Sequence, residues 1–414
     1  MNILFLTIGT FDSIDQHSVY TDLLRKFAQE GHPVYVVCSR EKRTGLPTEL
    51  FQEGNAQILK VRIGNITKTN LIEKGISTLR IEKAYIDAIE KYFKGVKFDL
   101  ILYSTPPITL AGTIQQLKNR DGAKTYLLLK DIFPQNAVDI GIMKKRGVKG
   151  ILYHYFRSKE KKLYNISDWI GCMSPANVDY VLKNNTWIDS QKVEICANTI
   201  EPQDLSVDQQ GRIALREKYR IPLDKKVFVY GGNLGKPQGI PFLIECLKGQ
   251  MQNPDAYFLV VGDGTEFGKL EMFFNEYQPS NMKLFKKLPK EDYDRMVAAC
   301  DVGLIFLDPR FTIPNFPSRL LSYMQAKLPV LCCTDPNTDV GQVCVEGGFG
   351  WWCESNDTAA FFEKVEAALS ADLTAMGENA FVYMQENYHV DSSFDTIMQH
   401  MAENADNAKA GALF

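Results

Sequence analysis

Paired cysteines and clustered histidines are missing from this chain of 414 residues. None of the nine cysteines belongs to a C-x-x-C pair, and the five histidines are scattered along the sequence. The chain therefore offers no ligand set for a structural zinc ion, and we expect no metal site. Unpaired cysteines fit a reducing compartment, in which they are small buried thiols.

Long apolar runs are missing as well. No segment has the roughly 18 uninterrupted apolar residues that a membrane-spanning helix needs. The first residues, Met1 to Gly9, lack the basic start and the cleavage site of a signal peptide, and they predict a buried first strand. We therefore expect the chain to stay in the cytoplasm.

A large charge of either sign is the third absence. The formal net charge is only −3, which argues against general nucleic-acid binding. Basic residues are nevertheless concentrated between Lys144 and Lys162, where eight of them accompany the single acid Glu160. Apolar residues within this segment follow the spacing of one helix face: Val148, Ile151, Leu152, Tyr155 and Phe156.

Two interpretations of residues 144–162 remain open. A basic amphipathic helix with aromatic residues suits the surface of an anionic membrane. The alternative is a helix that turns its apolar face to the core and its basic side to water. The membrane interpretation would place the protein at the inner face of the cell membrane.

The length and the alternation of short apolar runs with helical patterns predict two α/β domains with parallel sheets. The polar segment Asn198 to Asp208 contains Pro202 and is the expected linker, so we divide the chain into 1–203 and 204–380, with 381–414 as a final segment. Strands are expected at 3–6, 34–38, 100–103, 125–129, 169–173, 193–196, 227–230, 258–261, 282–285, 302–306 and 330–333.

The most informative motif is Pro317 to Ala326, followed by Lys-Leu-Pro329 and the apolar run Val330 to Cys333. It predicts a helix that opens with Pro317, so that free N–H groups at Ser318 and Arg319 could bind a phosphate above the sheet edge. Ser322 lies four residues after Ser318 on the same helix face and could reach a sugar hydroxyl. A nucleotide fits this pattern, although an ordinary loop that begins with proline would look the same.

A glycine-rich turn supports the nucleotide hypothesis. The apolar run that starts at Val227 ends in Gly232-Asn-Leu-Gly-Lys-Pro-Gln-Gly239, and a helical pattern follows. Glycines let backbone amides approach an anion, and Lys236 could neutralise a diphosphate oxygen. A similar strand ends in Gly262-Asp-Gly264, the kind of turn that follows the second strand of a nucleotide-binding half. Taken alone, each of these turns is an ordinary strand-to-helix connection.

In their order, these motifs resemble glycosyltransferase family 4, the retaining sugar transferases with the GT-B fold. The family signature is Pro-x-Lys, two apolar residues, Glu, Tyr-Met-Ala and Gly-x-Pro-Val. The segment PSRLLSYMQAKLPV follows it with Arg319 in place of Lys, Ser322 in place of Glu and Lys327 in place of Gly. The paired Glu residues of the family would fall at Pro314 and Ser322, so neither carboxylate is present.

The resemblance implies two Rossmann-like domains that face each other across a cleft, with the donor nucleotide on the second. A C-terminal helix from Phe381 would cross back to the first domain, and the Ala- and Asn-rich end after Met401 is expected to be frayed. The turn Gly-Asn-x-Gly-x-x-Gln-Gly is similar to that of a subgroup that builds bacterial capsular and surface polysaccharides. There, Asn233 and Lys236 would take the places of the diphosphate-binding Arg and Lys, and the backbone near Lys286 and Leu288 would hold the base. The implied donor residues are Gly232, Asn233, Lys236, Gln238, Gly262, Gly264, Lys286, Leu288, Pro317, Ser318, Arg319 and Ser322.

The first domain is expected to bind the acceptor. Its opening strand ends in Gly9-Thr10, and the resemblance implies that the loop from Phe11 to Ser18 faces the cleft. Lys130 and Asp131 follow the expected strand 125–129, at the edge where ligands bind in open α/β sheets. We take both as catalytic candidates, with Lys130 at the place of a family His. Asp131 could orient an acceptor hydroxyl or merely cap the following turn.

By resemblance, the chain moves a hexose or N-acetylhexosamine from a UDP-sugar to a polyprenyl-diphosphate-linked saccharide. The anomeric configuration would be retained, without a cofactor or a metal, because the helix N-terminus, Lys236 and Arg319 could neutralise the leaving diphosphate. Two alternatives remain. A non-catalytic nucleotide-sugar-binding subunit would explain the missing Glu residues. A UDP-sugar 2-epimerase would share the fold, but it needs acid and base residues on both sides of the sugar ring.

Overall fold

The computed structural model describes residues 1–66 and 71–411, and leaves the side chains of 71–76, 79, 148, 149 and 403–411 undescribed. The chain forms two compact units. Unit 1 consists of Met1–Val138, Met143–Glu201 and the chain from Val390 onward, and unit 2 consists of Asp139–Ile142 and Pro202–His389. The crossing at 201/202 lies within two residues of the expected boundary at 203, and the crossing at 389/390 lies later than the expected residue 381.

Unit 1 is built on an eight-stranded sheet in the order β3-β4-β2-β1-β5-β6-β7-β8. Only the pair β3–β4 at one edge is antiparallel. The order reverses between β1 and β5, which neighbour each other but lead to opposite edges. The strands are β1 (Ile3–Leu6), β2 (Val34–Glu41), β3 (Glu49–Glu53), β4 (Ala56–Ile63), β5 (Leu100–Ser104), β6 (Lys124–Leu129), β7 (Trp169–Cys172) and β8 (Val193–Ile195).

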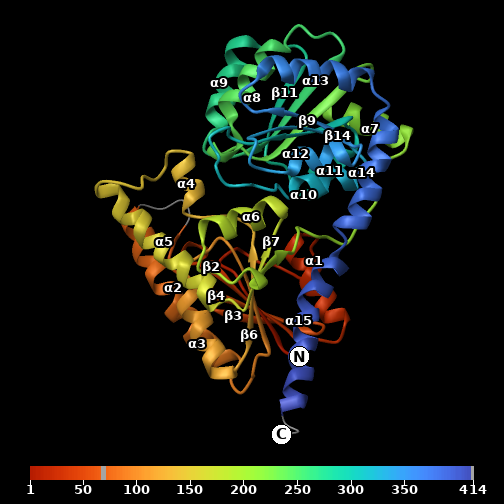
Figure 1. Cartoon of the computed structure of the whole chain (residues 1–414). Helices are drawn as coiled ribbons and strands as arrows, with labels where there is room; N and C mark the ends of the chain where they lie inside the picture. Colours follow the sequence, from red (N-terminus) through yellow and green to blue (C-terminus); the bar gives the residue numbers. More distant parts are fainter. Residues whose placement is uncertain (67–70, 412–414) are drawn as a thin grey trace. The chain divides into compact units, whose positions relative to one another are not determined.

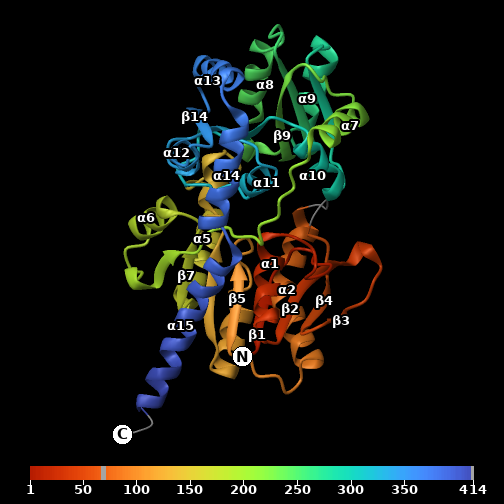
Figure 2. The same ribbon diagram turned by 90° about the vertical axis from the view of Figure 1, so that its right-hand side faces the viewer.

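Helices cover both faces of this sheet (Figure 1). They are α1 (Val19–Gln29), α2 (Leu71–Tyr92), α3 (Ala111–Asp121), α4 (Gln135–Asp139), α5 (Val148–Ile166), α6 (Pro175–Asn184) and α15 (Val390–Gly411). The last of these brings the end of the chain back beside α1 (Figures 1 and 2). The ring of Phe394 lies 5.0 Å from that of Phe27, and His400 stacks on Trp169 at 4.4 Å. The helix continues to Gly411, past Met401, where the sequence suggested a frayed end.

Unit 2 has a six-stranded, fully parallel sheet in the order β11-β10-β9-β12-β13-β14. Its order reverses between β9 and β12. The strands are β9 (Lys226–Asn233), β10 (Ala256–Asp263), β11 (Met282–Lys286), β12 (Val302–Phe306), β13 (Val330–Thr334) and β14 (Gly350–Glu354). The helices are α7 (Gln209–Tyr219), α8 (Ile240–Gly249), α9 (Phe267–Tyr277), α10 (Lys290–Ala298), α11 (Arg319–Gln325), α12 (Val340–Glu346), α13 (Thr358–Ser370) and α14 (Leu373–Asn387).

The predicted α/β class with two parallel-sheet domains is confirmed. Central strands such as β12 and β13 are unbroken apolar runs because both of their faces are buried. The strands β3, β4 and β14 were not predicted from the sequence. β4 alternates polar and apolar residues, and β3 and β14 are half-exposed edge strands, so none of them is a continuous apolar run. Within the described ranges, no helix has the length and apolar character that a bilayer crossing requires.

A buried carboxylate joins α7 to the sheet of unit 2. Asp301 precedes β12, and its Oδ2 accepts hydrogen bonds from Arg216 (2.6 Å) and from the backbone N–H of Val227 in β9 (2.7 Å). Its Oδ1 pairs with Arg212. Arg216 is itself buried and also donates to the carbonyl of Ala299. Loss of Asp301 would leave a buried cation without its counter-ion.

We therefore expect Asp301→Ala to lower the free energy of unfolding by about 3–5 kcal/mol, as breaking one side of a buried ion pair does. Urea denaturation of the two proteins measures the difference. Asp224→Ala, at an exposed carboxylate in the same unit, is the control and should change the free energy by less than about 0.5 kcal/mol. Equal effects of the two substitutions would contradict the assignment.

Candidate functional site

A cavity of about 530 Å³ lies at the carboxyl ends of β9 and β10 in unit 2. This is the sheet edge, next to the reversal of strand order, at which open α/β sheets bind ligands. Its volume falls in the range of small-molecule sites. The lining residues are Gly232, Asn233, Val261, Gly262, Asp263, Gly264, Lys287, Leu288, Lys290 and Tyr293.

The floor of this cavity is formed by two loops that hold each other. The N–H of Leu234 donates to the carbonyl of Asp263 (2.9 Å), and the N–H of Glu266 donates to the carbonyl of Leu234 (2.9 Å). A Cβ atom at Gly262 would overlap the carbonyl oxygen of Gly232, and one at Gly264 would lie 2.5 Å from that of Leu234. These two glycines therefore serve the close approach of the loops, and not only the approach of an anion.

Two predicted donor residues shape the glycine-rich turn. Gln238 Oε1 accepts hydrogen bonds from the side-chain amide of Asn233 (3.2 Å) and from the backbone N–H of Gly235 (3.3 Å). Residues Lys236–Gln238 form a short 3₁₀ turn, with the Lys236 side chain exposed to solvent. Asn233 still lines the cavity, whereas Lys236 does not.

The guanidinium of Arg319 lies beside Gly232, at the rim of the cavity lining. Its Cζ is 4.6 Å from the ring centroid of Tyr230, and a Cβ atom at Gly232 would lie 3.4 Å from its Nη2. Gly232 has φ +120°, a backbone conformation that side chains rarely adopt. Burial lowers the pKa of Arg319, but the neighbouring Tyr230 and Tyr323 hydroxyls raise it to a net value above the ordinary one. The group is therefore a permanent cation.

One nitrogen of this cation has no partner in the described part of the chain. Arg319 Nη1 is buried, and none of the described residues accepts a hydrogen bond from it. Buried polar groups are nearly always hydrogen-bonded, and an unpaired buried donor on a cation is especially costly. An anion at this position would complete its hydrogen bonding.

Helix α11 departs from its expected start. It begins at Arg319 and has seven residues, and Pro317 lies outside it, with its carbonyl accepting from the N–H of Leu320 (3.2 Å). Such a short helix has little macrodipole, so the attraction of a phosphate rests on the Arg319 charge. Ser318 is exposed and Ser322 is half-buried, on the side of the helix away from its buried leucines, tyrosine and methionine.

Five cavity residues were not anticipated as part of the site: Val261, Asp263, Lys287, Lys290 and Tyr293. The Tyr293 ring fills the space in front of Gly231, where a Cβ atom would collide with its hydroxyl. Lys286 was anticipated, but its side chain lies outside the lining, with Nζ 5.7 Å from the ring centroid of Phe267. In the sequence, the two lysines and Tyr293 are indicated only by the basic run from Lys286 to Lys290 at the end of β11 and by the aromatic residue one helical turn later.

In unit 1, the two catalytic candidates have different surroundings. The Lys130 ammonium donates to the backbone carbonyls of Cys196 (3.2 Å) and Ala197 (3.1 Å), and burial lowers its pKa. These bonds tie the end of β6 to the segment after β8, so the ammonium is engaged by backbone carbonyls of unit 1, and a catalytic role of Lys130 stays a prediction. Gly9 and Thr10 are exposed after β1.

Asp131 keeps one oxygen without a partner. Its Oδ2 accepts from the Asn136 side chain (2.6 Å), while Oδ1 is buried and accepts no hydrogen bond from any described residue. Burial raises its pKa to about 6. Tyr20, close by on α1, also has a raised pKa because it is buried, and its hydroxyl is hydrogen-bonded to Ser104 at the end of β5. These groups meet at the carboxyl edge of the sheet, next to the β1/β5 reversal.

Helix α5 carries the basic segment and exposes apolar side chains. Ile151 is 71% exposed and Leu152 is 52% exposed, and Tyr155 also faces solvent. Phe156 instead packs on Phe133, with ring centroids 5.0 Å apart. The expected single apolar face is therefore divided. Its member Val148 and the neighbouring basic residue Lys149 lie outside the described side chains. The acid Glu160 is buried and paired with Arg157 (2.6 Å).

The Asp131 environment leads to a prediction on stability. Because its pKa is raised, the folded protein binds this proton more tightly than the unfolded chain does, so stability is lost as the pH rises from about 4 to about 6, and the loss is complete above that. Asp131→Asn should therefore raise the free energy of unfolding by about 1–3 kcal/mol near pH 7.5, with little gain near about pH 3, where the carboxyl group is mostly protonated in both states. Denaturation curves at the two pH values measure this. A gain that does not depend on pH would contradict it.

Comparison with known proteins identifies the class. Residues 211–382 match the family model described as glycosyl transferases group 1. The chain is 26% identical over 323 residues to the probable glycosyltransferase WbjE of Pseudomonas aeruginosa, covering 78% of each chain. It is 24% identical over 258 residues to the putative colanic acid biosynthesis glycosyl transferase WcaI of Escherichia coli, covering 60% of each.

Among solved structures, the fold is similar to that of Anabaena HepE in complex with UDP and glucose. The TM-score is 0.69 at 13% identity, over 97% of this chain and 100% of that one. The two parallel-sheet units give the chain the GT-B fold, and these matches show that it is similar to glycosyltransferases of the family 4 type.

Proposed function

We propose that the protein transfers a hexose or N-acetylhexosamine from a UDP-sugar to a lipid-linked saccharide, with retention, in bacterial surface polysaccharide biosynthesis. The observation that carries this proposal is the half-buried Arg319 cation, whose buried Nη1 has no partner among the described residues and which lies beside Gly232 of the 530 Å³ cavity. The similarity to HepE, which was solved with UDP, supports the donor. The similarity to WcaI supports the pathway class.

In this proposal, the diphosphate binds against Arg319 and the glycine-rich turn. The planar guanidinium can donate two parallel hydrogen bonds to phosphate oxygens. Lys287 and Lys290 add positive charge to the cavity wall, and exposed Lys236 adds it from the turn. These cations stabilise the negative charge that develops on the leaving diphosphate, so the chain itself supplies the neutralisation that a metal gives elsewhere.

The other parts of the donor follow from the same edge of the sheet. The base lies along the backbone near Leu288, which lines the cavity. Ser322 provides a neutral hydroxyl for the ribose in place of the family Glu. Asp131 receives the acceptor hydroxyl at its unpartnered oxygen, and the hydroxyl attacks the anomeric carbon from the face that the diphosphate leaves. A donor phosphate oxygen takes the acceptor proton.

The absence of carboxylates at Pro314 and Ser322 favours one rival, a subunit that binds a nucleotide sugar without turning it over. An assay of turnover distinguishes this rival from the proposed transferase. Candidate UDP-sugars incubated with membranes containing lipid-linked saccharide should yield UDP and an extended lipid product. A 2-epimer formed without acceptor would instead indicate the epimerase. Binding without any product would leave only the non-catalytic subunit.

We further propose that α5 associates with the anionic inner surface of the cell membrane. Its exposed Ile151, Leu152 and Tyr155 would enter the headgroup region. Exposed Lys144, Lys145 and Arg146 lie just before the helix and would approach the headgroups. Glu160, the single acid between residues 144 and 162, is buried and paired with Arg157, so it does not offset the exposed cations.

The first prediction compares the contributions of Arg319 and Lys236 to UDP binding. Arg319→Gln should weaken UDP binding on the order of tenfold to a hundredfold, because it removes charge-assisted hydrogen bonds from a partly buried position. Lys236→Gln, at an exposed and flexible cation, should weaken it by less than about fivefold. Calorimetric titration with UDP measures both. Unchanged UDP affinity in Arg319→Gln would contradict the proposal that the donor diphosphate binds at Arg319.

The second prediction concerns the membrane. Changing Lys144, Lys145 and Arg146 to Gln should weaken binding to anionic liposomes on the order of a hundredfold, since each cation contributes about 1 kcal/mol at such a surface. Ile151→Ser with Leu152→Ser should weaken the binding that persists in high salt, because apolar insertion is not screened. Sedimentation with liposomes measures both effects.

Met272→Ser is the matched control for the apolar substitutions. Met272 lies on α9 of unit 2 and is 64% exposed, as an isolated apolar side chain. It should leave liposome binding unchanged. If the control and the α5 variants bind alike, the helix is only a solvated basic surface.

A further inference from the structure

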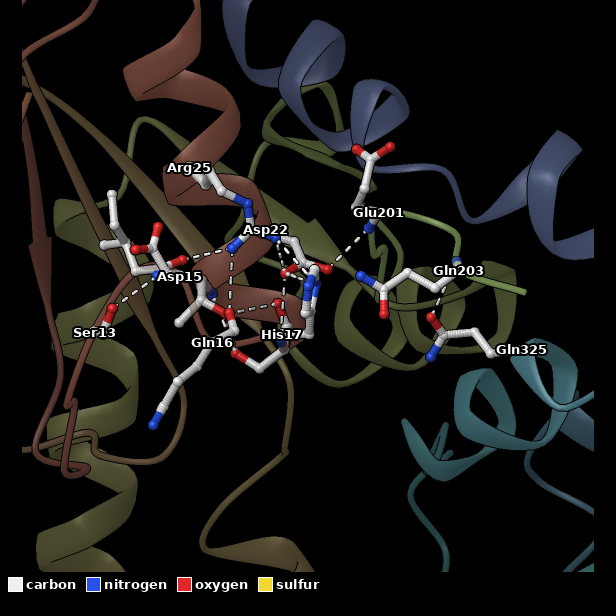
Figure 3. A network of polar contacts seen from close by, with 12 residues as sticks. Ser13, Asp15, Gln16, His17, Asp22, Arg25, Glu201, Gln203 and Gln325 are labelled. Atoms are coloured by element: carbon white, nitrogen blue, oxygen red, sulfur yellow. Dashed lines mark hydrogen bonds and ion pairs between the residues drawn. The ribbon is translucent and has the colours of Figure 1, made fainter. Parts of the chain in front are cut away.

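One buried carboxylate in α1 holds three separate segments of unit 1. Asp22 is 2% exposed, and its Oδ1 accepts from Arg25 Nη2 (2.5 Å) and from the backbone N–H of Ser18 (3.3 Å). Its Oδ2 accepts from the backbone N–H of Glu201 (2.9 Å). Figure 3 shows Asp22 between these groups, with His17 Nδ1 3.4 Å from Oδ1.

Through Arg25, the same carboxylate fixes the loop 11–18. Arg25 Nη1 donates to the backbone carbonyls of Ile14 (2.5 Å) and Gln16 (3.2 Å). The loop follows β1 at its carboxyl end, beside the reversal of strand order between β1 and β5. That position is the ligand-binding edge of an open α/β sheet, so the loop belongs to the acceptor side of the proposed transferase.

Glu201 is the last residue of unit 1 before the chain enters unit 2. The residues that follow it are held in unit 2 by the end of α11. The N–H of Gln203 donates to Gln325 Oε1 (3.2 Å), and the N–H of Leu205 donates to the Gln325 carbonyl (2.8 Å). Asp204 pairs with Lys327 (3.1 Å). Gln325 is the last residue of α11, and Arg319 is its first.

The segment 201–205 is thus hydrogen-bonded at one end to the carboxylate that fixes the acceptor-side loop. At its other end it is bonded to the helix that carries the donor-side cation. Only Pro202 separates the residue that is bonded to Asp22 from the residue that is bonded to Gln325. The arrangement offers a physical connection between the two ligand sides that runs along the backbone.

We propose that Asp22 is a positioning residue that couples loop 11–18 to donor binding at Arg319 through the segment 201–205. The coupling rests on the proposed function, in which an anion binds at Arg319. Occupation of that site fixes α11, α11 fixes Gln203 and Leu205, and the Glu201 amide then holds Asp22 and the loop. By thermodynamic linkage, an ordered loop would in turn favour donor binding.

Hydrogen exchange of the full-length protein without ligand tests the first half of this chain of contacts. In Asp22→Asn, both the loop 11–18 and the Glu201–Leu205 segment should exchange faster, on the order of tenfold or more, because both lose a charge-assisted acceptor. Glu30→Gln is the matched control. Glu30 is a carboxylate at the end of the same helix, paired with Lys26, and its loss should leave both segments unchanged. Faster exchange in only one segment would overturn the coupling.

Addition of UDP tests the second half. UDP should slow exchange of loop 11–18 in the wild type, and this protection should be lost in Asp22→Asn and in Gln325→Ala, which breaks the other end of the segment. Arg25→Gln serves as a second variant if Asp22→Asn does not fold, and it should free the loop while keeping Glu201 protected. UDP binding to the wild type without protection of the loop would overturn the inference and leave the proposed function standing. If the wild type binds no UDP, the assignment of a UDP-sugar as the donor is contradicted. Hydrogen exchange without ligand would still test the contacts between loop 11–18, Asp22 and the segment 201–205.

Turnover adds a readout that a purely structural role would not move. In the transfer reaction, Asp22→Asn should raise the KM for the acceptor on the order of tenfold, and, because the linkage is reciprocal, it should raise the KM for the donor as well. A loss of thermal stability with both constants unchanged would show that Asp22 only supports the fold.

Discussion

A guanidinium held beside a backbone turn is the constraint on which the ligand edge of unit 2 depends. Arg319 lies against the Tyr230 ring and beside Gly232, whose φ of +120° is a backbone conformation that side chains rarely adopt. Gly232 in turn lies in contact with Gly262, so the loops after β9 and β10 are held together at that point. The cavity exists because these backbone segments are so close that no Cβ atom fits between them. The glycines therefore fix the position of the cation as well as the shape of the cavity.

Polar groups without partners occur at the carboxyl edges of both sheets. Within the described residues, Arg319 Nη1 in unit 2 and Asp131 Oδ1 in unit 1 are both buried and make no hydrogen bond. Each lowers stability in the absence of a ligand, since an unsatisfied buried group keeps its full desolvation cost. One is a cation and the other is a carboxyl group whose pKa is raised to about 6. A cation suits the diphosphate of the proposed donor, and a carboxyl group suits the hydroxyl of the proposed acceptor.

The acceptor side depends on side chains whose partners are distant in sequence. Asp22 bonds to Glu201, and Lys130 bonds to Cys196 and Ala197. These bonds fix the last segment of unit 1 just before the chain leaves it. The proposed coupling follows from this arrangement, because the segment that closes unit 1 continues directly into contacts with α11. The basic helix α5 is separate from this system, and its exposed apolar residues concern only the proposed membrane surface.

The sequence by itself determined the fold class and the places at which a nucleotide could bind. Apolar runs buried on both faces and glycines at strand ends are local patterns, so the strands β9, β10 and β12 and the turns Gly232 to Gly239 and Gly262 to Gly264 could be predicted from them. The edge strands β3 and β14 could not, because a half-exposed strand has no continuous apolar run. Only the tertiary structure decided which polar atoms remain available for a ligand. Lys130 and Gln238 are engaged by neighbouring backbone or side-chain groups, whereas Arg319 and Asp131 each keep one buried atom unpaired in the described chain. The residues that surround these atoms are brought together by the sheets from distant parts of the sequence. For that reason no local pattern could distinguish a lysine bonded to backbone carbonyls from an arginine that keeps a buried nitrogen unpaired.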